Sequence, residues 1–216
     1  MMGLTRVICA TMALASAPAV AQGQAGPPAP DAGVEIGASV LAHGVQIPFK
    51  PKAPAGMFYG RTVEDGTADV QLLVRSRPLP FALKPRLAAK VQVNLSGLTS
   101  FAAVGAEWRQ HVLRDRVYGQ IGIGLAVHDG YTNIPDPFDL TPGSADFYKR
   151  YDLYRSRTDF GSRVLFNPSF SAGVRLDRSW AIEAAWEHMS HGGLFARAND
   201  GIDTVGIRLI RTIRRK

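Results

Sequence analysis

The feature that most constrains this chain is a strict alternation of apolar and polar residues in segments of about ten residues. In residues 89–95, Lys90, Gln92 and Asn94 fall on one side and Val91, Val93 and Leu95 on the other. Successive side chains of a β-strand point to opposite faces, so such a segment predicts a strand with one apolar and one polar face. The same pattern recurs at 117–128 and 164–176, and less regularly at 34–45, 69–78, 100–113, 179–191 and 202–213.

These eight segments predict an all-β fold, an eight-stranded antiparallel transmembrane β-barrel over residues 34–216. An even number of short alternating strands is typical of small bacterial outer-membrane barrels. The small and charged residues on the polar faces suit a narrow lumen that side chains fill. A soluble lipocalin-like barrel, apolar inside and polar outside, gives the same alternation. The Lys, Arg and Glu content of the polar faces and an export signal favour the membrane barrel.

That export signal occupies the first 21 residues. Arg6 supplies a positive charge, residues 7–15 form an apolar run, and residues 19–21, Ala-Val-Ala, form a small-x-small cleavage site. These three parts in this order predict a secretory signal peptide, which is too short and wrongly flanked for a transmembrane helix. We therefore expect an exported protein in the bacterial outer membrane.

The exported part is expected to have no disulfide, because the single cysteine, Cys9, lies in the signal peptide. Residues 22–33 are rich in Pro, Gly and Ala and predict a flexible lead-in. The formal net charge of the chain is +7. For a protein of the cell envelope this charge favours anionic lipid head groups over nucleic acid as the partner.

Polar residues interrupt the apolar face of the segment 179–191. Counting by twos from Trp180 places Trp186, His188 and Ser190 on that face, which a membrane barrel turns toward lipid. In the last segment Asp203 begins the corresponding apolar face. A hydroxyl, an imidazole and a carboxylate are therefore expected to meet at the outer rim of the hydrocarbon band, where polar groups are costly unless they pair or serve a function.

Such a set of groups suits nucleophilic catalysis. An imidazole that takes the proton of a serine hydroxyl activates it, and a carboxylate on the other ring nitrogen fixes the tautomer. Gly192 and Gly193 follow the serine and offer backbone N–H groups to an oxyanion. A lone His-x-Ser is a weak signal, and a girdle of polar residues at the lipid boundary is the alternative. This chemistry requires no metal or cofactor.

The segment Glu187-His188-Met189-Ser190-His191-Gly192-Gly193-Leu194, followed by Asn199-Asp200-Gly201-Ile202-Asp203, resembles the signature of the lipid A 3-O-deacylase (PagL) family. The resemblance implies an eight-stranded outer-membrane barrel that hydrolyses the 3-O ester of lipid A in the outer leaflet. It implies His188 as general base, Ser190 as nucleophile and Asp203 as orienting acid. It also implies that Asn199 shapes the loop beside the site.

Two departures of the chain from this family pattern concern the site itself, and a third is the ending Arg214-Arg215-Lys216 in place of the aromatic residue common at the end of such barrels. The family usually has asparagine after the serine, a contributor to the oxyanion site, where this chain has His191. The family acid is typically glutamate, and Asp203 is one methylene shorter. Two alternatives therefore stay open: an inactive structural or lipopolysaccharide-binding barrel, and an esterase that acts on phospholipid or on secondary acyl chains. The sequence does not indicate the oligomeric state.

Overall fold

The computed structural model describes residues 33–45 and 64–214. The expected signal peptide, and the lead-in except for its last residue, lie outside the described residues. The strands are β1 (Val34–His43), β2 (Thr67–Arg75), β3 (Arg86–Asn94), β4 (Phe101–Val112), β5 (Val117–His128), β6 (Val164–Phe166), β7 (Ser169–Arg175), β8 (Trp180–Met189) and β9 (Ile202–Ile213). Each is antiparallel to its neighbours.

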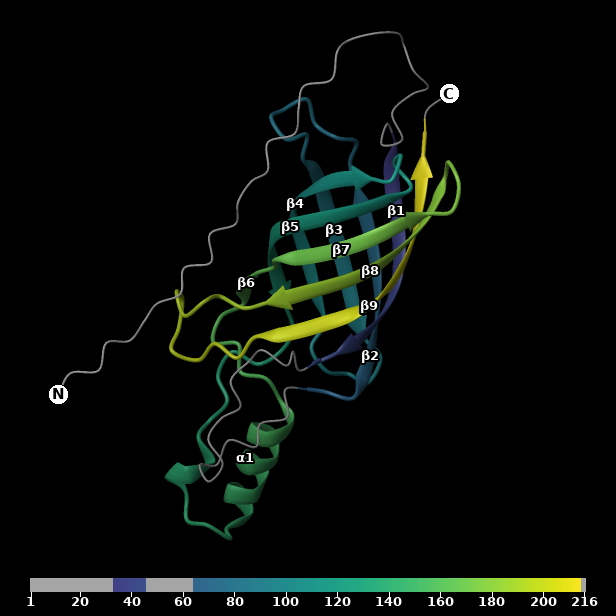
Figure 1. The fold of residues 1–216 in the computed structure, drawn as a ribbon. Coiled ribbons are helices and arrows are strands. Elements are labelled where there is room, and N and C mark those ends of the chain that lie inside the picture. The colour runs from purple at the N-terminus through teal and green to yellow at the C-terminus, as the bar shows by residue number, and fades with distance from the viewer. Residues whose placement is uncertain (1–32, 46–63, 215–216) are drawn as a thin grey trace, which may run out of the picture.

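The sheet closes on itself as a barrel (Figure 1). Strand β1 pairs with both β2 and β9, and β4 pairs with β5, so the order around the barrel follows the chain. β6 and β7 both pair with β5 and together take one strand position. The predicted eight-stranded antiparallel barrel is thus confirmed.

The segment 164–176 differs from the continuous strand that its alternation predicts. It breaks at Asn167 and Pro168, between β6 and β7. Proline has no N–H to give to a strand ladder, so it is confined to edges, strand starts and bulges. Here the carbonyl of Pro168 accepts from the backbone N–H of His188 at 3.0 Å. The break leaves β6 free to pair with the residues that follow β8.

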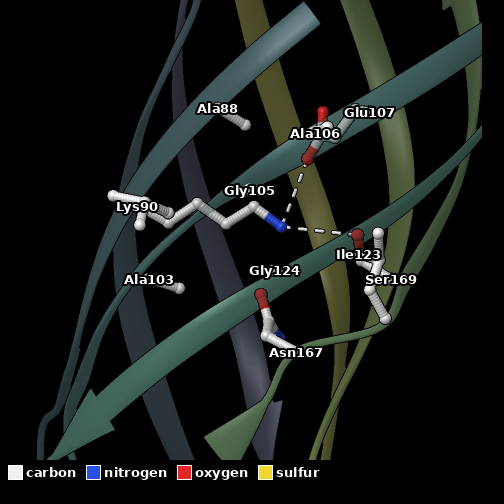
Figure 2. Close-up of a pocket in the computed structure, with 11 residues that line it drawn as sticks. Ala88, Lys90, Ala103, Gly105, Ala106, Glu107, Ile123, Gly124, Asn167 and Ser169 are labelled. Atoms are coloured by element: carbon white, nitrogen blue, oxygen red, sulfur yellow. Dashed lines mark hydrogen bonds and ion pairs between the residues drawn. The ribbon is translucent and has the colours of Figure 1, made fainter. Parts of the chain in front are cut away.

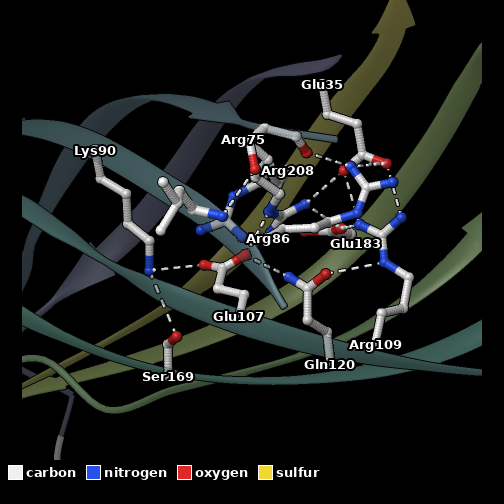
Figure 3. Close-up of polar contacts among 12 residues, drawn as sticks. Glu35, Arg75, Arg86, Lys90, Glu107, Arg109, Gln120, Ser169, Glu183 and Arg208 are labelled. Carbon is white, nitrogen blue, oxygen red and sulfur yellow. Dashed lines mark hydrogen bonds and ion pairs between the residues drawn. The ribbon is translucent and has the colours of Figure 1, made fainter. Parts of the chain in front are cut away.

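The interior of the barrel is polar, as expected for a lumen filled by side chains. Glu183 accepts from Arg75 at 2.7 and 3.0 Å and from Arg208 at 3.0 Å. Arg109 donates to both oxygens of Glu35 at 2.7 Å. Figure 3 shows these charged groups interleaved across the lumen. Buried charges are tolerated only when they are paired and hydrogen-bonded, and each of these carboxylates meets an arginine from another strand.

Small residues make room for one lysine within this interior. Gly105 and Gly124 face each other in register on β4 and β5. Lys90 reaches across this space to Glu107 at 3.2 Å and to Ser169 at 3.4 Å (Figure 2). The lumen is therefore packed with side chains rather than open as a pore.

The exterior is apolar. Many large apolar side chains on the outward faces of the strands are about half exposed or more. They include Val40, Leu72, Val91, Val104, Ile121, Ile123, Leu125, Val127, Phe170 and Ile207. A contiguous apolar surface of this extent is not left in water by soluble monomers. A polar interior with an apolar exterior is the arrangement of a membrane barrel. It excludes the lipocalin-like alternative.

The two ends of the barrel differ. At one end lie the tight turns 113–116 and 176–179, and β9 finishes there. At the other end, the connection 129–163 contains a short 3-10 helix, η1 (Pro137–Asp139), and α1 (Ala145–Ser156), which projects away from the barrel (Figure 1). The sequence predicts only a surface loop there. Among the described residues, no helix is long and apolar enough to span a membrane.

A buried carboxylate ties the connections together at the α1 end. Glu64 accepts backbone N–H groups from Thr99 at 2.9 Å and Thr158 at 3.1 Å. Its other neighbours are His43, at 3.3 Å, and Arg157, also at 3.3 Å. One side chain therefore joins β1 to two separate connections, at the end of the barrel where β8 ends and β9 begins.

Candidate active site

The candidate site lies where β8 ends and β9 begins, at the α1 end of the barrel (Figure 1). In the antiparallel register of these two strands, His188 stands directly opposite Asp203. His188 and Ser190 are two residues apart and share the outward face. Glu187 and Met189, which alternate with them along the chain, are buried in the interior.

Three side chains form a continuous hydrogen-bonded chain. The Nδ1 atom of His188 is 2.8 Å from Oδ1 of Asp203. Its Nε2 atom is 2.9 Å from the hydroxyl oxygen of Ser190. If Nδ1 carries the proton and donates to the carboxylate, Nε2 is left as an acceptor for the serine proton. This is the order of contacts that activates a serine nucleophile.

The carboxylate is hidden although it belongs to an outward face. Asp203 is 2% exposed, whereas the side chain of His188 is 20% exposed. Trp186 lies beside both: its indole N–H donates to Oδ1 of Asp203 at 3.2 Å, and its ring stacks on that of His188 with centroids 6.1 Å apart. The acid is thus shielded, while the imidazole and hydroxyl remain accessible from the membrane side.

The backbone of Ser190 is fixed by the short strand β6. The N–H of Phe166 donates to the carbonyl of Ser190 at 2.8 Å, and the N–H of Ser190 donates back to Phe166 at 3.2 Å. Behind β8, the side chain of Asn167 donates to the carbonyl of His188 at 3.1 Å. The break at Asn167 and Pro168 therefore supports both residues of the His-x-Ser pair.

The loop after Ser190 is organised by His191, which is fully buried. Its backbone N–H donates to the side-chain oxygen of Asn199 at 2.9 Å. Its ring contacts the carbonyl of Ala198 through Nε2 at 2.8 Å and receives the N–H of Phe195 on Nδ1 at 3.3 Å. The His191 ring therefore supports the loop and does not point to an oxyanion beside Ser190, and Asn199 likewise holds the loop.

Gly192 and Gly193 form a turn that begins two residues after the serine. Both have positive φ, 61° and 75°, which glycine adopts without strain. Their N–H groups donate to no acceptor within the described part of the chain. Two consecutive free N–H groups beside a nucleophile are suited to bind a developing oxyanion. Leu194 and Phe195, which follow, are largely exposed and apolar.

Other charged residues of β8 and β9 lie away from Ser190. Glu187 immediately precedes His188 in the chain, but its carboxylate faces the lumen and pairs with Lys90 and Arg208. Arg208 is itself buried and pairs with Glu183 and Glu187. Arg211 stacks on Trp180, near the opposite end of β8. These residues do not approach Ser190.

The sequence did not indicate two supporting residues, Trp186 and Asn167. Alternation placed Trp186 on the correct face, but its hydrogen bond depends on the register between β8 and β9. The role of Asn167 depends on the strand break at Pro168. For metals, the described residues contain no group of three or more His, Cys, Asp or Glu side chains arranged to hold an ion.

Comparison with known proteins gives one family and several solved structures. Residues 79–211 match the family model described as "Lipid A 3-O-deacylase (PagL)", and this span contains β3 to β8, nearly all of β9 and the whole candidate site. No curated protein sequence matches the chain.

Among solved structures, the chain is similar to the outer membrane enzyme PagL, with a TM-score of 0.53 and 14% sequence identity, covering 83% of this chain and 99% of that one. It is also similar to Neisserial surface protein A, with a TM-score of 0.45 and 9% identity, covering 83% of this chain and 96% of that one. The first likeness agrees with the barrel fold described above.

Proposed function

This chain belongs to the lipid A 3-O-deacylase (PagL) family, and on that premise we propose that it is an outer-membrane serine esterase. It hydrolyses the ester that links an acyl chain to the 3 position of lipid A. The observation that carries the proposal is the hydrogen-bonded chain from Ser190 through His188 to Asp203. Its membrane-facing position gives these groups access to an ester at the boundary between head group and acyl chains.

Acylation begins when the hydroxyl oxygen of Ser190 attacks the ester carbonyl. His188 takes the serine proton on Nε2, and Asp203 stabilises the imidazolium that results. The N–H groups of Gly192 and Gly193 bind the oxyanion of the tetrahedral intermediate. The bond from the carbonyl carbon to the sugar oxygen then breaks, and His188 returns the proton to that oxygen.

Deacylation repeats these steps with water as the nucleophile. His188 takes a proton from water, the hydroxide attacks the acyl-serine ester, and the serine oxygen leaves with the proton. The products are a fatty acid and a lipid A with a free 3-hydroxyl. Residues 1–21 direct export, and the substrate is drawn from lipopolysaccharide of the outer leaflet.

Product analysis with purified protein in detergent tests the substrate. Incubation with lipid A is expected to release a 3-hydroxy fatty acid, and incubation with phospholipid is expected to release none. Release of a plain fatty acid instead would show that the site acts on a secondary acyl chain or on phospholipid. A folded protein that releases nothing from either lipid would indicate the inactive, lipopolysaccharide-binding barrel.

A further inference from the structure

We propose that Trp186 is a positioning residue of this site, whose indole N–H holds the carboxylate of Asp203 against the ring of His188. The inference rests on the proposed role of the three hydrogen-bonded residues. It adds a fourth member, which acts through the acid and does not touch the reacting atoms.

The geometry of two neighbouring strands carries this inference. Trp186 and His188 share the outward face of β8, and Asp203 stands opposite His188 on β9. A single oxygen of the carboxylate, Oδ1, accepts from His188 at 2.8 Å and from Trp186 at 3.2 Å. Two donors fixed on one strand therefore hold one acceptor on the other, so that the carboxylate cannot rotate away without losing both bonds.

The surroundings of Asp203 explain why a second donor matters. The acid is 2% exposed on a face that otherwise meets hydrocarbon, and an ionised carboxylate removed from water needs hydrogen bonds to remain charged. The indole supplies one such bond, and its ring also covers the acid by stacking on His188 at 18°. Aspartate has a short side chain, so its reach is limited to the ring directly across the strand pair.

The variant Trp186→Phe tests the bond because phenylalanine keeps an apolar aromatic ring and lacks the N–H. Trp180→Phe is the matched control, since Trp180 lies on the same face of the same strand and contacts Arg211 instead. Losing one hydrogen bond to a charged group lowers kcat about tenfold to a hundredfold. We expect that fall for Trp186→Phe with KM changed by no more than about twofold, as for loss of a transition-state interaction alone. Trp180→Phe is expected to match the wild type.

A double-mutant cycle separates positioning from simple packing. If Trp186 acts through the carboxylate, adding Trp186→Phe to Asp203→Ala lowers kcat by no more than about twofold further. If the indole only packs on the imidazole, Trp186→Phe lowers kcat by the same factor in the wild type and in Asp203→Ala. The second result would overturn the proposal. Heat-modified migration on gels confirms that each variant is folded.

Labelling of Ser190 gives a readout that does not depend on the lipid. The serine oxygen attacks the phosphorus of an alkyl fluorophosphonate, the P–F bond breaks, fluoride leaves, and His188 takes the serine proton. We expect the labelling rate of Trp186→Phe to fall about tenfold or more below that of Trp180→Phe, in the range given for one hydrogen bond to a charged group. Equal rates would refute the role of Trp186. A wild type that is labelled but releases no fatty acid would refute only the proposed substrate, and one that is neither labelled nor active would refute both.

Discussion

Replacing Asp203 by asparagine removes one negative charge and leaves the shape of the side chain unchanged. The carboxylate lies 2.8 Å from Nδ1 of His188. At that separation, with an effective dielectric constant of about 20, a unit charge stabilises the imidazolium by about 6 kcal/mol. Part of this is recovered by the amide dipole and by water at the exposed edge of the ring. We therefore expect kcat to fall by about 10³ to 10⁴, or about 4 to 5.5 kcal/mol.

The assay is the initial rate of fatty-acid release from lipid A by purified, folded protein at saturating substrate. Glu187→Gln is the control, because Glu187 precedes His188 in the chain but points into the lumen toward Lys90 and Arg208. The kcat of Glu187→Gln, per folded molecule, is expected to stay within about threefold of the wild type, because Glu187 makes no contact with the transition state. A loss in Glu187→Gln equal to that in Asp203→Asn would refute the assignment of the acid, and so would an unchanged rate in Asp203→Asn.

Three further predictions concern the lumen, the loop and the connections at the α1 end. Glu183→Gln removes the carboxylate charge that Arg75 and Arg208 share and should lower the free energy of unfolding by about 3–5 kcal/mol, measured by urea unfolding in lipid vesicles; an unchanged midpoint would contradict the role of the network. Asn199→Ala removes the acceptor for the N–H of His191 and should lower kcat about tenfold per folded molecule; an unchanged kcat would show that this bond does not shape the site. Burial alone would raise the pKa of the Glu64 carboxyl, but its hydrogen bonds lower that pKa from 4.5 to about 2. Its stabilisation is therefore complete above pH 4.5 and is lost as the pH falls toward 2. Amides in the connections that it joins should therefore lose protection against hydrogen exchange, measured relative to the intrinsic exchange rate at each pH, and Glu64→Gln should abolish that loss.

Alternation was sufficient to predict the faces of the barrel. It placed His188 and Ser190 on the outside and Lys90 and Gln92 on the opposite, polar face, because side chains two residues apart share a face. The register between strands was not predictable in the same way. It depends on the loop from Ser190 to Asp203, whose length alone does not say which residue of β9 stands opposite His188.

The features that the sequence did not predict all depend on tertiary contacts. Pro168 indicates a disturbed strand, but the pairing of β6 with Ser190 appears only in three dimensions. The helix α1 has no buried residue and no apolar stripe facing the barrel; its rings, such as that of Tyr154, instead contact Phe138. His191 departs from the family pattern as a residue type, but its buried ring hydrogen-bonds to the loop residues Ala198 and Phe195.

The most direct test of the central claim is mass spectrometry of lipid A from cells that express the wild type or Ser190→Ala. In cells that express the wild type, hydrolysis is expected to replace one 3-hydroxyacyl group of lipid A by hydrogen and to lower the mass of lipid A accordingly. Ser190→Ala, folded to the same extent, is expected to leave lipid A unchanged. The same loss of an acyl group in both samples, or in neither, would contradict the account.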